Sequence, residues 1–164
     1  MSESGDQAEQ EKPELFVKRI TLEANLEKLA GKIQSAQWDQ GNDMEGAHYS
    51  AESLRWYLGL ESTYFFVCFI GSELAGMVSA QRQPRPYGQE HALYIDELDT
   101  AVNYRRLGVA SALMEAVKAL ALEIDSEELW LGTEKSNFAA QKLYESLSPD
   151  LIEEFVGYTW ELED

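Results

Sequence analysis

Two stretches of this chain carry the three- and four-residue spacing of apolar positions that is typical of helices. The clearer one predicts a helix over about Leu107 to Ile124, with one face packed on a sheet. Its apolar positions are Ala110, Leu113, Met114, Val117, Leu120, Ala121 and Ile124. An earlier helix is predicted from a Thr21 cap to about Trp38. Its apolar positions are Leu22, Leu26, Leu29, Ala30 and Ile33.

Shorter apolar or alternating runs, bounded by turn residues, predict the strands. The first three are Leu15–Ile20 and a hairpin, Tyr64–Ile70 and Leu74–Gln81, which turns at Gly71-Ser72-Glu73. A Pro- and Gly-containing loop, Gln83–Glu90, follows the hairpin. The later predicted strands are His91–Asp99, Glu128–Gly132 and a closing pair, Leu151–Val156 and Tyr158–Leu162.

Two more helices complete the element order. Ser50 is expected to cap a short helix that ends near Leu58, and Asn137–Leu147 is expected to be helical until Ser148-Pro149 ends it. The order β-α-α-β-β-β-α-β-α-β-β predicts an α+β fold, in which a mixed sheet has helices on its faces.

The composition of the 164 residues, 45% of them hydrophobic, fits one globular domain over residues 14–164. Residues 1–13 are polar and acidic and are expected to form a mobile tail. The longest apolar run, Tyr64–Ile70, is too short to cross a membrane, and the N-terminus has no apolar signal-peptide core. We therefore expect a cytoplasmic protein that does not bind membranes.

Charge and cysteine usage exclude several classes of function. The formal net charge of −17 disfavours binding to nucleic acid, whose phosphates it would repel, and is compatible with a cationic substrate or simply with solubility. The single cysteine, Cys68, lies within an apolar run and is expected to be a buried core residue. Together with only two histidines it cannot form a zinc site, so no metal is expected.

A local basic turn stands out against this acidic background. The run Tyr104-Arg105-Arg106-Leu107-Gly108-Val109-Ala110 joins a predicted strand to the start of the long helix. Cations are disfavoured at a helix N-terminus unless an anion binds there, and the small residues leave the first-turn amides accessible. The run therefore predicts a phosphate-binding turn, although a plain strand-to-helix turn with surface arginines has the same pattern.

The same residues carry a resemblance to a known family. Arg105 to Ala110 resembles the Q/R-x-x-G-x-G/A signature of the GNAT acetyltransferases, and Asn137 to Tyr144 resembles their N-x-x-A-x-x-L-Y helix at the expected separation. Within the family, Tyr94 to Leu98 followed by the basic turn is most similar to the aminoglycoside 3-N-acetyltransferase branch. The resemblance implies a central, mostly antiparallel sheet with helices on both faces.

The resemblance also implies acetyl-CoA as co-substrate. The signature turn would bind the coenzyme diphosphate through Arg105, Arg106, Gly108, Val109 and Ala110. The preceding Leu98, Asp99 and Thr100, where the family has Leu-Ala-Val, would pair by backbone with the pantetheine arm. Asn137 would contact the pantetheine side of the coenzyme, and Tyr144 would stand near the thioester sulfur as general acid. Asn137 could instead, or also, cap its helix.

The general base is sought among Asp96, Glu97 and Asp99, because neighbouring carboxylates in a strand with apolar neighbours can accept a proton from an ammonium group or simply bind it. Alternation places Glu97 with Asp99 on one face of the strand and Asp96 with Leu98 on the other, unless a bulge changes the faces. Glu97 aligns with an acidic residue of the aminoglycoside branch and is the first choice. Asp99 is either a second substrate contact or a solvent-facing charge.

In the resembling family the acceptor pocket is built by the first helices and their loop. Here these supply Trp38 and Asp39 as substrate contacts together with Glu97, and aromatic and acidic side chains suit a cationic amine. Further residues in this region are Asp43, Met44, Glu45, Trp56 and Tyr57. The alternative is that the aromatic residues pack in the core and the acids belong to a solvated loop.

The sequence thus predicts an N-acetyltransferase acting on a small primary amine such as an aminoglycoside or a polyamine. The alternatives are a protein lysine or N-terminal acetyltransferase, and a non-catalytic acyl-CoA-binding module. The sheet edges and the closing strands are compatible with a homodimer.

Overall fold

A computed structural model of the chain describes residues 11–38 and 48–163. Most of the predicted tail and the predicted loop Asp39–Ala47 lie outside the described residues. The chain divides into two compact units, Met1–Leu131 and Gly132–Asp164, and each is described by itself.

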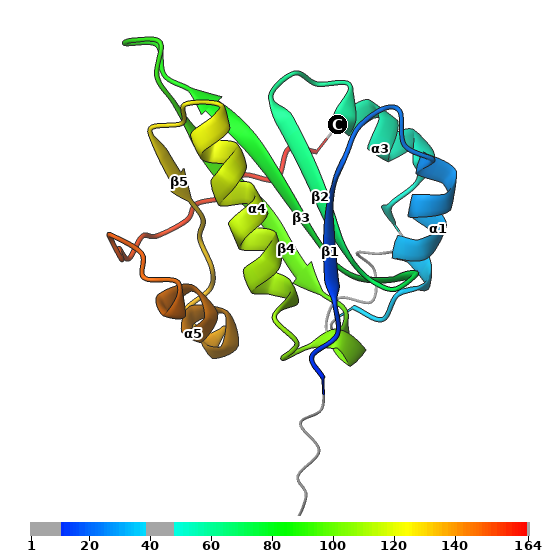
Figure 1. The fold of residues 1–164 in the computed structure, drawn as a ribbon. Helices are drawn as coiled ribbons and strands as arrows, with labels where there is room; N and C mark the ends of the chain where they lie inside the picture. Colours follow the sequence, from blue (N-terminus) through cyan, green and yellow to red (C-terminus); the bar gives the residue numbers. More distant parts are fainter. Residues whose placement is uncertain (1–10, 39–47, 164) are drawn as a thin grey trace, which may run out of the picture. The chain divides into compact units, whose positions relative to one another are not determined.

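The first unit is built on a five-stranded sheet in the order β1-β2-β3-β4-β5 (Figure 1). The strands are β1 Leu15–Ile20, β2 Thr63–Ile70, β3 Glu73–Pro84, β4 His91–Thr100 and β5 Glu128–Trp130. The first four pair antiparallel and β5 pairs parallel to β4, which confirms the predicted mixed, mostly antiparallel sheet. β3 runs to Pro84, past its predicted end at Gln81, because it pairs with β4 as far as His91.

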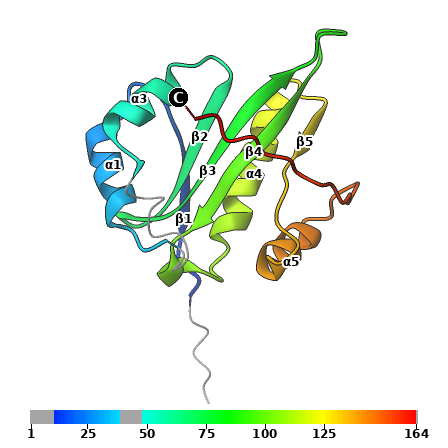
Figure 2. The same cartoon turned by 180° about the vertical axis from the view of Figure 1, so that it is seen from behind.

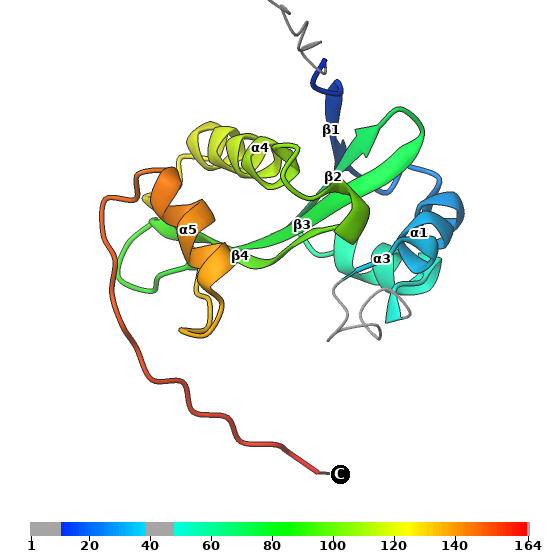
Figure 3. The same ribbon diagram turned by 90° about the horizontal axis from the view of Figure 1, so that it is seen from below.

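Helices cover both faces of this sheet, as predicted. α4, Val109–Glu123, lies on one face, whereas α1, Leu26–Ser35, and α3, Ala51–Leu58, lie on the other (Figure 3). Seen from behind, β4 stands in front of α4 (Figure 2). The sheet therefore separates two hydrophobic cores.

The α4-side core joins the apolar face of α4 to one face of the strands, because the predicted three- and four-residue spacing places its large side chains together. Its helix residues include Val109, Leu113, Val117 and Leu120. The α1/α3-side core uses the opposite face of the same strands. Its residues include Leu26, Ile33, Leu54, Phe65 and Met77.

The N-terminal caps are partly as predicted. Ser50 caps α3 through a reciprocal pair of hydrogen bonds with Ser53, which confirms that prediction. The predicted Thr21 cap of α1 is wrong, because Asn25 accepts the hydrogen bond from the Lys28 amide and starts the helix four residues later. Thr21 instead belongs to a turn in which the Ala24 amide donates to its carbonyl.

In the described part of the second unit, residues 132–163, there is one helix, α5 Phe138–Ser146, which Asn137 caps by accepting from the Ala140 amide. The predicted closing strands are wrong for this structure, since residues 147–163 contain neither helix nor strand. An alternating pattern indicates which side chains share a face, but a strand also needs a hydrogen-bonded neighbour. Residues 132–163 contain no strand that could be this neighbour.

Candidate functional site

The predicted phosphate-binding turn lies between the end of β4 and the start of α4. A short 3₁₀ helix, Val102–Tyr104, follows β4, and two hydrogen bonds hold its first residues in place. The Ala101 amide donates to the Ala75 carbonyl at 2.8 Å, and the Val102 amide donates to the Gln37 carbonyl at 2.7 Å. The turn therefore starts from a fixed point on the sheet.

Two residues of the turn have left-handed backbone conformations. Gly108, the N-cap of α4, has φ 85°, and Arg106 has φ 62°. Glycine adopts this region without steric cost, whereas arginine is strained there. The side chains of Arg105 and Arg106 are exposed, and no side chain caps the first turn of α4. This arrangement suits an anion at the helix N-terminus.

The first turn of α4 is held against the sheet by an unusually close approach. A Cβ built on Gly76 of β3 would lie 2.6 Å from Val109 Cγ1 and 2.9 Å from the Asp99 carbonyl oxygen. Only glycine leaves this space, and Val109 and Leu113 are buried over it. The position of the helix N-terminus is thus fixed by packing.

Only part of the edge of β4 that leads to this turn is paired with another strand. β5 pairs with β4 only from Ala92 to Tyr94, whereas β4 continues to Thr100. Leu98, Asp99 and Thr100 are each half-buried and lie beyond the last pair with β5. An extended ligand with amide groups could therefore add along this part of the edge.

A bulge interrupts β4 next to these residues. Ile95 pairs with Ala80 and Glu97 pairs with Ser79, so Asp96 is the extra residue. Leu98 packs against the α4-side core, while Glu97 and Asp99 pair with Ser79 and Met77. Because Met77 belongs to the α1/α3-side core, the two carboxylates share that face, as predicted.

The predicted placement of Asp96 with Leu98 assumed strict alternation, which the bulge interrupts. The Asp96 carboxylate acts electrostatically on the hydroxyl of Tyr57, which packs on the α1/α3 side. In a bulge, two successive residues oppose one partner, so strict alternation fails at this position. Three carboxylates are therefore gathered near the bulge.

Two tyrosines from the α3 region face these carboxylates. The Tyr49 hydroxyl donates to Glu97 Oε2 at 3.3 Å. The Tyr57 hydroxyl donates to the Ala80 carbonyl at 3.0 Å, at the bulge itself. Burial, with the negative charges of Asp96 and Glu97, raises the pKa of Tyr57 to about 12, so Tyr57 stays a neutral donor.

The predicted substrate contacts have different environments. Trp38 is buried in the α1/α3-side core, and its indole N–H donates to the Ile33 carbonyl at 2.8 Å. Trp56 is 69% exposed, and Asp39 lies outside the described residues. A role for Trp38 or Asp39 in substrate binding stays a prediction.

The remaining predicted site residues, Asn137 and Tyr144, belong to α5 of the second unit. Oδ1 of Asn137 is the helix cap, which leaves its amide N–H₂ group for another contact. Tyr144 is half-buried near the end of the same helix. Their contacts with a coenzyme stay predictions.

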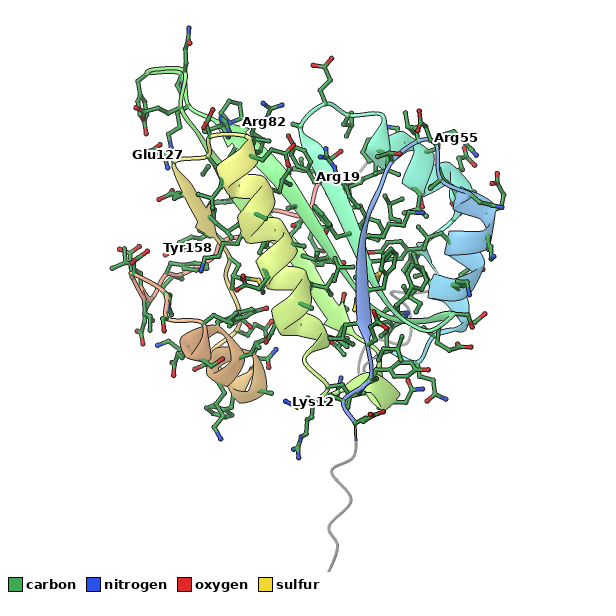
Figure 4. All side chains as sticks on the ribbon, viewed as in Figure 1. Lys12, Arg19, Arg55, Arg82, Glu127 and Tyr158 are labelled. Carbon is green, nitrogen blue, oxygen red and sulfur yellow. The ribbon has the colours of Figure 1, made fainter. Side chains whose placement is uncertain are left out.

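A shallow cavity of about 500 Å³ lies at the other end of the sheet from the turn, near Arg82 and Glu127 (Figure 4). Arg85 in its lining is paired with Glu127 at 2.7 Å and with Glu128 at 2.6 Å. This cavity contains none of the predicted site residues.

Within residues 11–38 and 48–163, no three His, Cys, Asp or Glu side chains gather as metal ligands would. None of the helices described in this structure is long and apolar enough to cross a membrane. Cys68 is fully buried, as predicted.

Comparison with known proteins decides the family. The model of the acetyltransferase (GNAT) family matches residues 27–148. The chain belongs to the GNAT family. The matched range includes the turn at Arg105 to Ala110, the bulged strand β4 and the helix α5, so the family prediction made from the sequence motifs is confirmed.

Relatives and solved structures agree with this family. An N-alpha-acetyltransferase of Saccharolobus solfataricus is 28% identical over 110 residues, which cover 61% of this chain and 64% of the relative. A mouse N-acetyltransferase family 8 member 3 is 29% identical over 97 residues, 59% of this chain and 43% of the relative. The chain thus spans less than two thirds of the length of these relatives.

The fold is also that of known GNAT structures. An aminoglycoside acetyltransferase from an uncultured soil metagenomic sample superposes with a TM-score of 0.78 at 23% identity, covering 91% of this chain and 97% of that one. A ribosomal-protein-alanine N-acetyltransferase from Brucella melitensis biovar Abortus 2308 gives 0.68 at 16% identity, covering 91% and 99%.

Two contributors to this GNAT site were missed from the sequence. Gly76 lies inside an apolar strand. Only the position of α4, whose Val109 leaves no room for a Cβ there, shows why this residue must be glycine. Tyr49 directly precedes the Ser50 cap, and an apolar residue at that position commonly packs against the helix residue four places after the cap, here Leu54. That signal would have predicted its burial, although not its contact with Glu97.

Proposed function

We propose that this chain is an acetyl-CoA-dependent N-acetyltransferase that acts on a primary amine of a small cationic molecule, such as an aminoglycoside or a polyamine. The observation that carries the proposal is the start of α4. Its N-terminus follows a left-handed Gly108, has no capping side chain and is flanked by Arg105 and Arg106.

The chemistry of this turn fits the coenzyme diphosphate. The amides of Gly108, Val109 and Ala110 would donate to its oxygens, and the guanidinium groups of Arg105 and Arg106 would add charge-assisted hydrogen bonds. A Cβ at position 108 would need the unfavourable left-handed conformation, so glycine keeps the approach open. The structure of AAC(6′)-Iy, a neighbour at 14% identity, holds the bisubstrate analogue CoA-S-monomethyl-acetylneamine.

The rest of the coenzyme would lie along β4. Backbone groups of Leu98, Asp99 and Thr100 would pair with the pantetheine amides, beyond the point where β5 leaves the strand. Asn137 would bind the same arm with its side-chain amide. These contacts would place the thioester carbonyl near the bulge.

The acceptor amine must lose a proton before its nitrogen lone pair can attack the thioester carbon. Glu97 would accept that proton as general base, and Asp99 on the same face would bind the cationic substrate. As the C–N bond forms and the C–S bond breaks, the Tyr144 hydroxyl would donate a proton to the departing thiolate. The second proton of the amine nitrogen, which leaves as the amide forms, would restore the Tyr144 hydroxyl directly or through solvent. Backbone amides of β4 would stabilise the oxyanion.

The acidic surroundings favour a cationic acceptor. Asp96, Glu97 and Asp99 gather around the bulge, and the net charge of −17 attracts cations from a distance. One solved neighbour is an aminoglycoside acetyltransferase in complex with sisomicin. A peptide N-terminus is the second candidate acceptor, since a relative at 28% identity is an N-alpha-acetyltransferase.

A panel assay tests the proposal. The protein is incubated with acetyl-CoA and, separately, sisomicin, spermidine, a lysine peptide or a peptide with a free N-terminus, and product mass and thiol release are followed. We expect acetylated sisomicin or spermidine, and a loss of turnover in Y144F and E97Q. Coenzyme binding without any acetylated product would favour a non-catalytic module, and no thermal shift with millimolar acetyl-CoA would reject the proposal.

We propose that the edge strands of the sheet, β1 and β5, allow a homodimer to form. Analytical ultracentrifugation of the same samples would test this.

A further inference from the structure

We propose that Tyr49 is a positioning residue for Glu97: it orients the carboxylate and favours its ionised form. This inference rests on the proposed role of Glu97 as general base. It adds a residue that directly precedes the Ser50 cap of α3 to the residues proposed from β4, the turn before α4 and α5.

The contact itself joins two residues that are 48 positions apart in the chain. The Tyr49 hydroxyl donates to Glu97 Oε2 at 3.3 Å, which is long for an O–H···O hydrogen bond. Catalytic hydrogen bonds are often long before substrate binds and shorten in the complex. Glu97 is exposed, and a hydrogen bond from Tyr49 limits the rotamers of its side chain.

Tyr49 is itself held from three elements. Its ring packs 6.2 Å from that of Phe65 on β2, with an angle of 30° between the rings. Its carbonyl accepts a hydrogen bond from Gln34 Nε2 on α1 at 2.5 Å. The following residue, Ser50, is fixed as the cap of α3. The hydroxyl is therefore presented to Glu97 by a rigid frame, as positioning requires.

Glu97 has acidic neighbours on its own strand. Asp96 and Asp99 lie on the same strand, and negative charges beside a carboxylate oppose its ionisation. From α3, Tyr57 contributes no compensating charge, because its raised pKa keeps it neutral and its hydroxyl donates to Ala80. The hydrogen bond from Tyr49 acts in the opposite direction and favours the carboxylate.

A direct titration of the Glu97 carboxyl group distinguishes the positioning role of Tyr49 from a role in packing alone. Carbon-13 NMR of glutamate carboxyl groups follows Glu97 in the wild type and in Y49F, with E97Q assigning the signal. We expect the Glu97 midpoint to rise by about 0.5 pH unit in Y49F, since a hydrogen bond to a charged group is lost from an exposed site. The matched control Y87F removes a hydroxyl from a 74% exposed tyrosine and should leave the midpoint unchanged.

Kinetics give a second, independent measurement. The acidic limb of the pH profile of kcat/KM for sisomicin acetylation should move up by the same amount in Y49F, with activity recovering at higher pH. In an E97Q background, Y49F should change kcat/KM less than twofold, because the two residues act through one contact. A merely structural role would lower activity at every pH and in both backgrounds.

The outcomes distinguish the two proposals. A Glu97 midpoint that is the same in Y49F and wild type would overturn the inference, even in an enzyme that acetylates amines. A midpoint that moves in a protein that transfers no acetyl group would uphold the Tyr49–Glu97 coupling and reject the proposed function instead. A folded Y49F that loses activity equally across the pH range would also overturn the inference.

Discussion

Val109, the first residue of α4, lies directly over Gly76 of β3, where a Cβ would be only 2.6 Å from Val109 Cγ1. This contact sets how closely the N-terminus of α4 approaches the sheet. Because the proposed diphosphate site is that N-terminus, its geometry depends on a glycine of a neighbouring strand, outside the proposed site.

Replacing Gly76 with alanine tests this dependence. The added methyl group would also meet the Asp99 carbonyl oxygen, which is backbone and cannot rotate away. We expect G76A to lower the free energy of unfolding by about 1–3 kcal/mol, the usual cost of overpacking, as measured by urea denaturation.

The matched control is G31A in α1, where the added methyl group would meet no described atom within 4 Å apart from its chain neighbours and the backbone of its own helix. Alanine is favoured over glycine within a helix, so G31A should raise stability by about 0.5–1 kcal/mol. If G76A were as stable as the wild type, the close-packing account of α4 would be wrong.

Arg106 allows stability and binding to be separated. Its φ of 62° is unfavourable for arginine and free of strain for glycine. We expect R106G to melt at a higher temperature than R106A, while both variants bind acetyl-CoA about tenfold more weakly by calorimetry, since each loses one charge-assisted contact. Unchanged affinity in both would remove Arg106 from the proposed diphosphate site.

The raised pKa of Tyr57 predicts that the folded protein loses stability at alkaline pH. Its pKa is about 12 in the folded protein and near its ordinary value of 10.0 in the unfolded chain, so the folded state holds the proton more tightly. Stability should be unaffected by this group below pH 10 and should fall as the pH rises from 10 towards 12. Denaturation of wild type and Y57F across that range should show a steeper decline in the wild type, and parallel curves would contradict the assignment.

Cys68 should be unreactive in the native protein. Its side chain is 0% exposed, and burial raises the pKa of the thiol, so little thiolate forms and none is accessible. We expect an aromatic disulfide reagent at pH 8 to label it only after unfolding in guanidinium. Rapid labelling of folded protein would show that the α4-side core opens readily.

The elements that local patterns determine were predictable. Strand β1 and the caps at Ser50 and Asn137 follow from residues close in sequence, as does the basic turn before α4. The predicted start of α1 was wrong because Thr21 and Asn25 are both favourable N-cap residues, and the local sequence does not distinguish between them.

Features set by distant residues were not predictable. The bulge at Asp96 depends on how β4 registers with β3, and it interrupts the alternation of side chains along the strand. The contact between Tyr49 and Glu97 depends on where α3 packs on the sheet. The prediction of the closing strands was wrong for a related reason. The alternation of residues between Leu151 and Leu162 does not indicate which strand they would pair with.

The most direct test of the account is a titration of nitrogen-15-labelled protein with acetyl-CoA, followed through the backbone amide signals. The account predicts large, saturable shifts at Gly108, Val109 and Ala110, and much smaller ones there with acetyl-pantetheine, which lacks the diphosphate. Saturable binding of acetyl-CoA that leaves these three amide signals unmoved would contradict it.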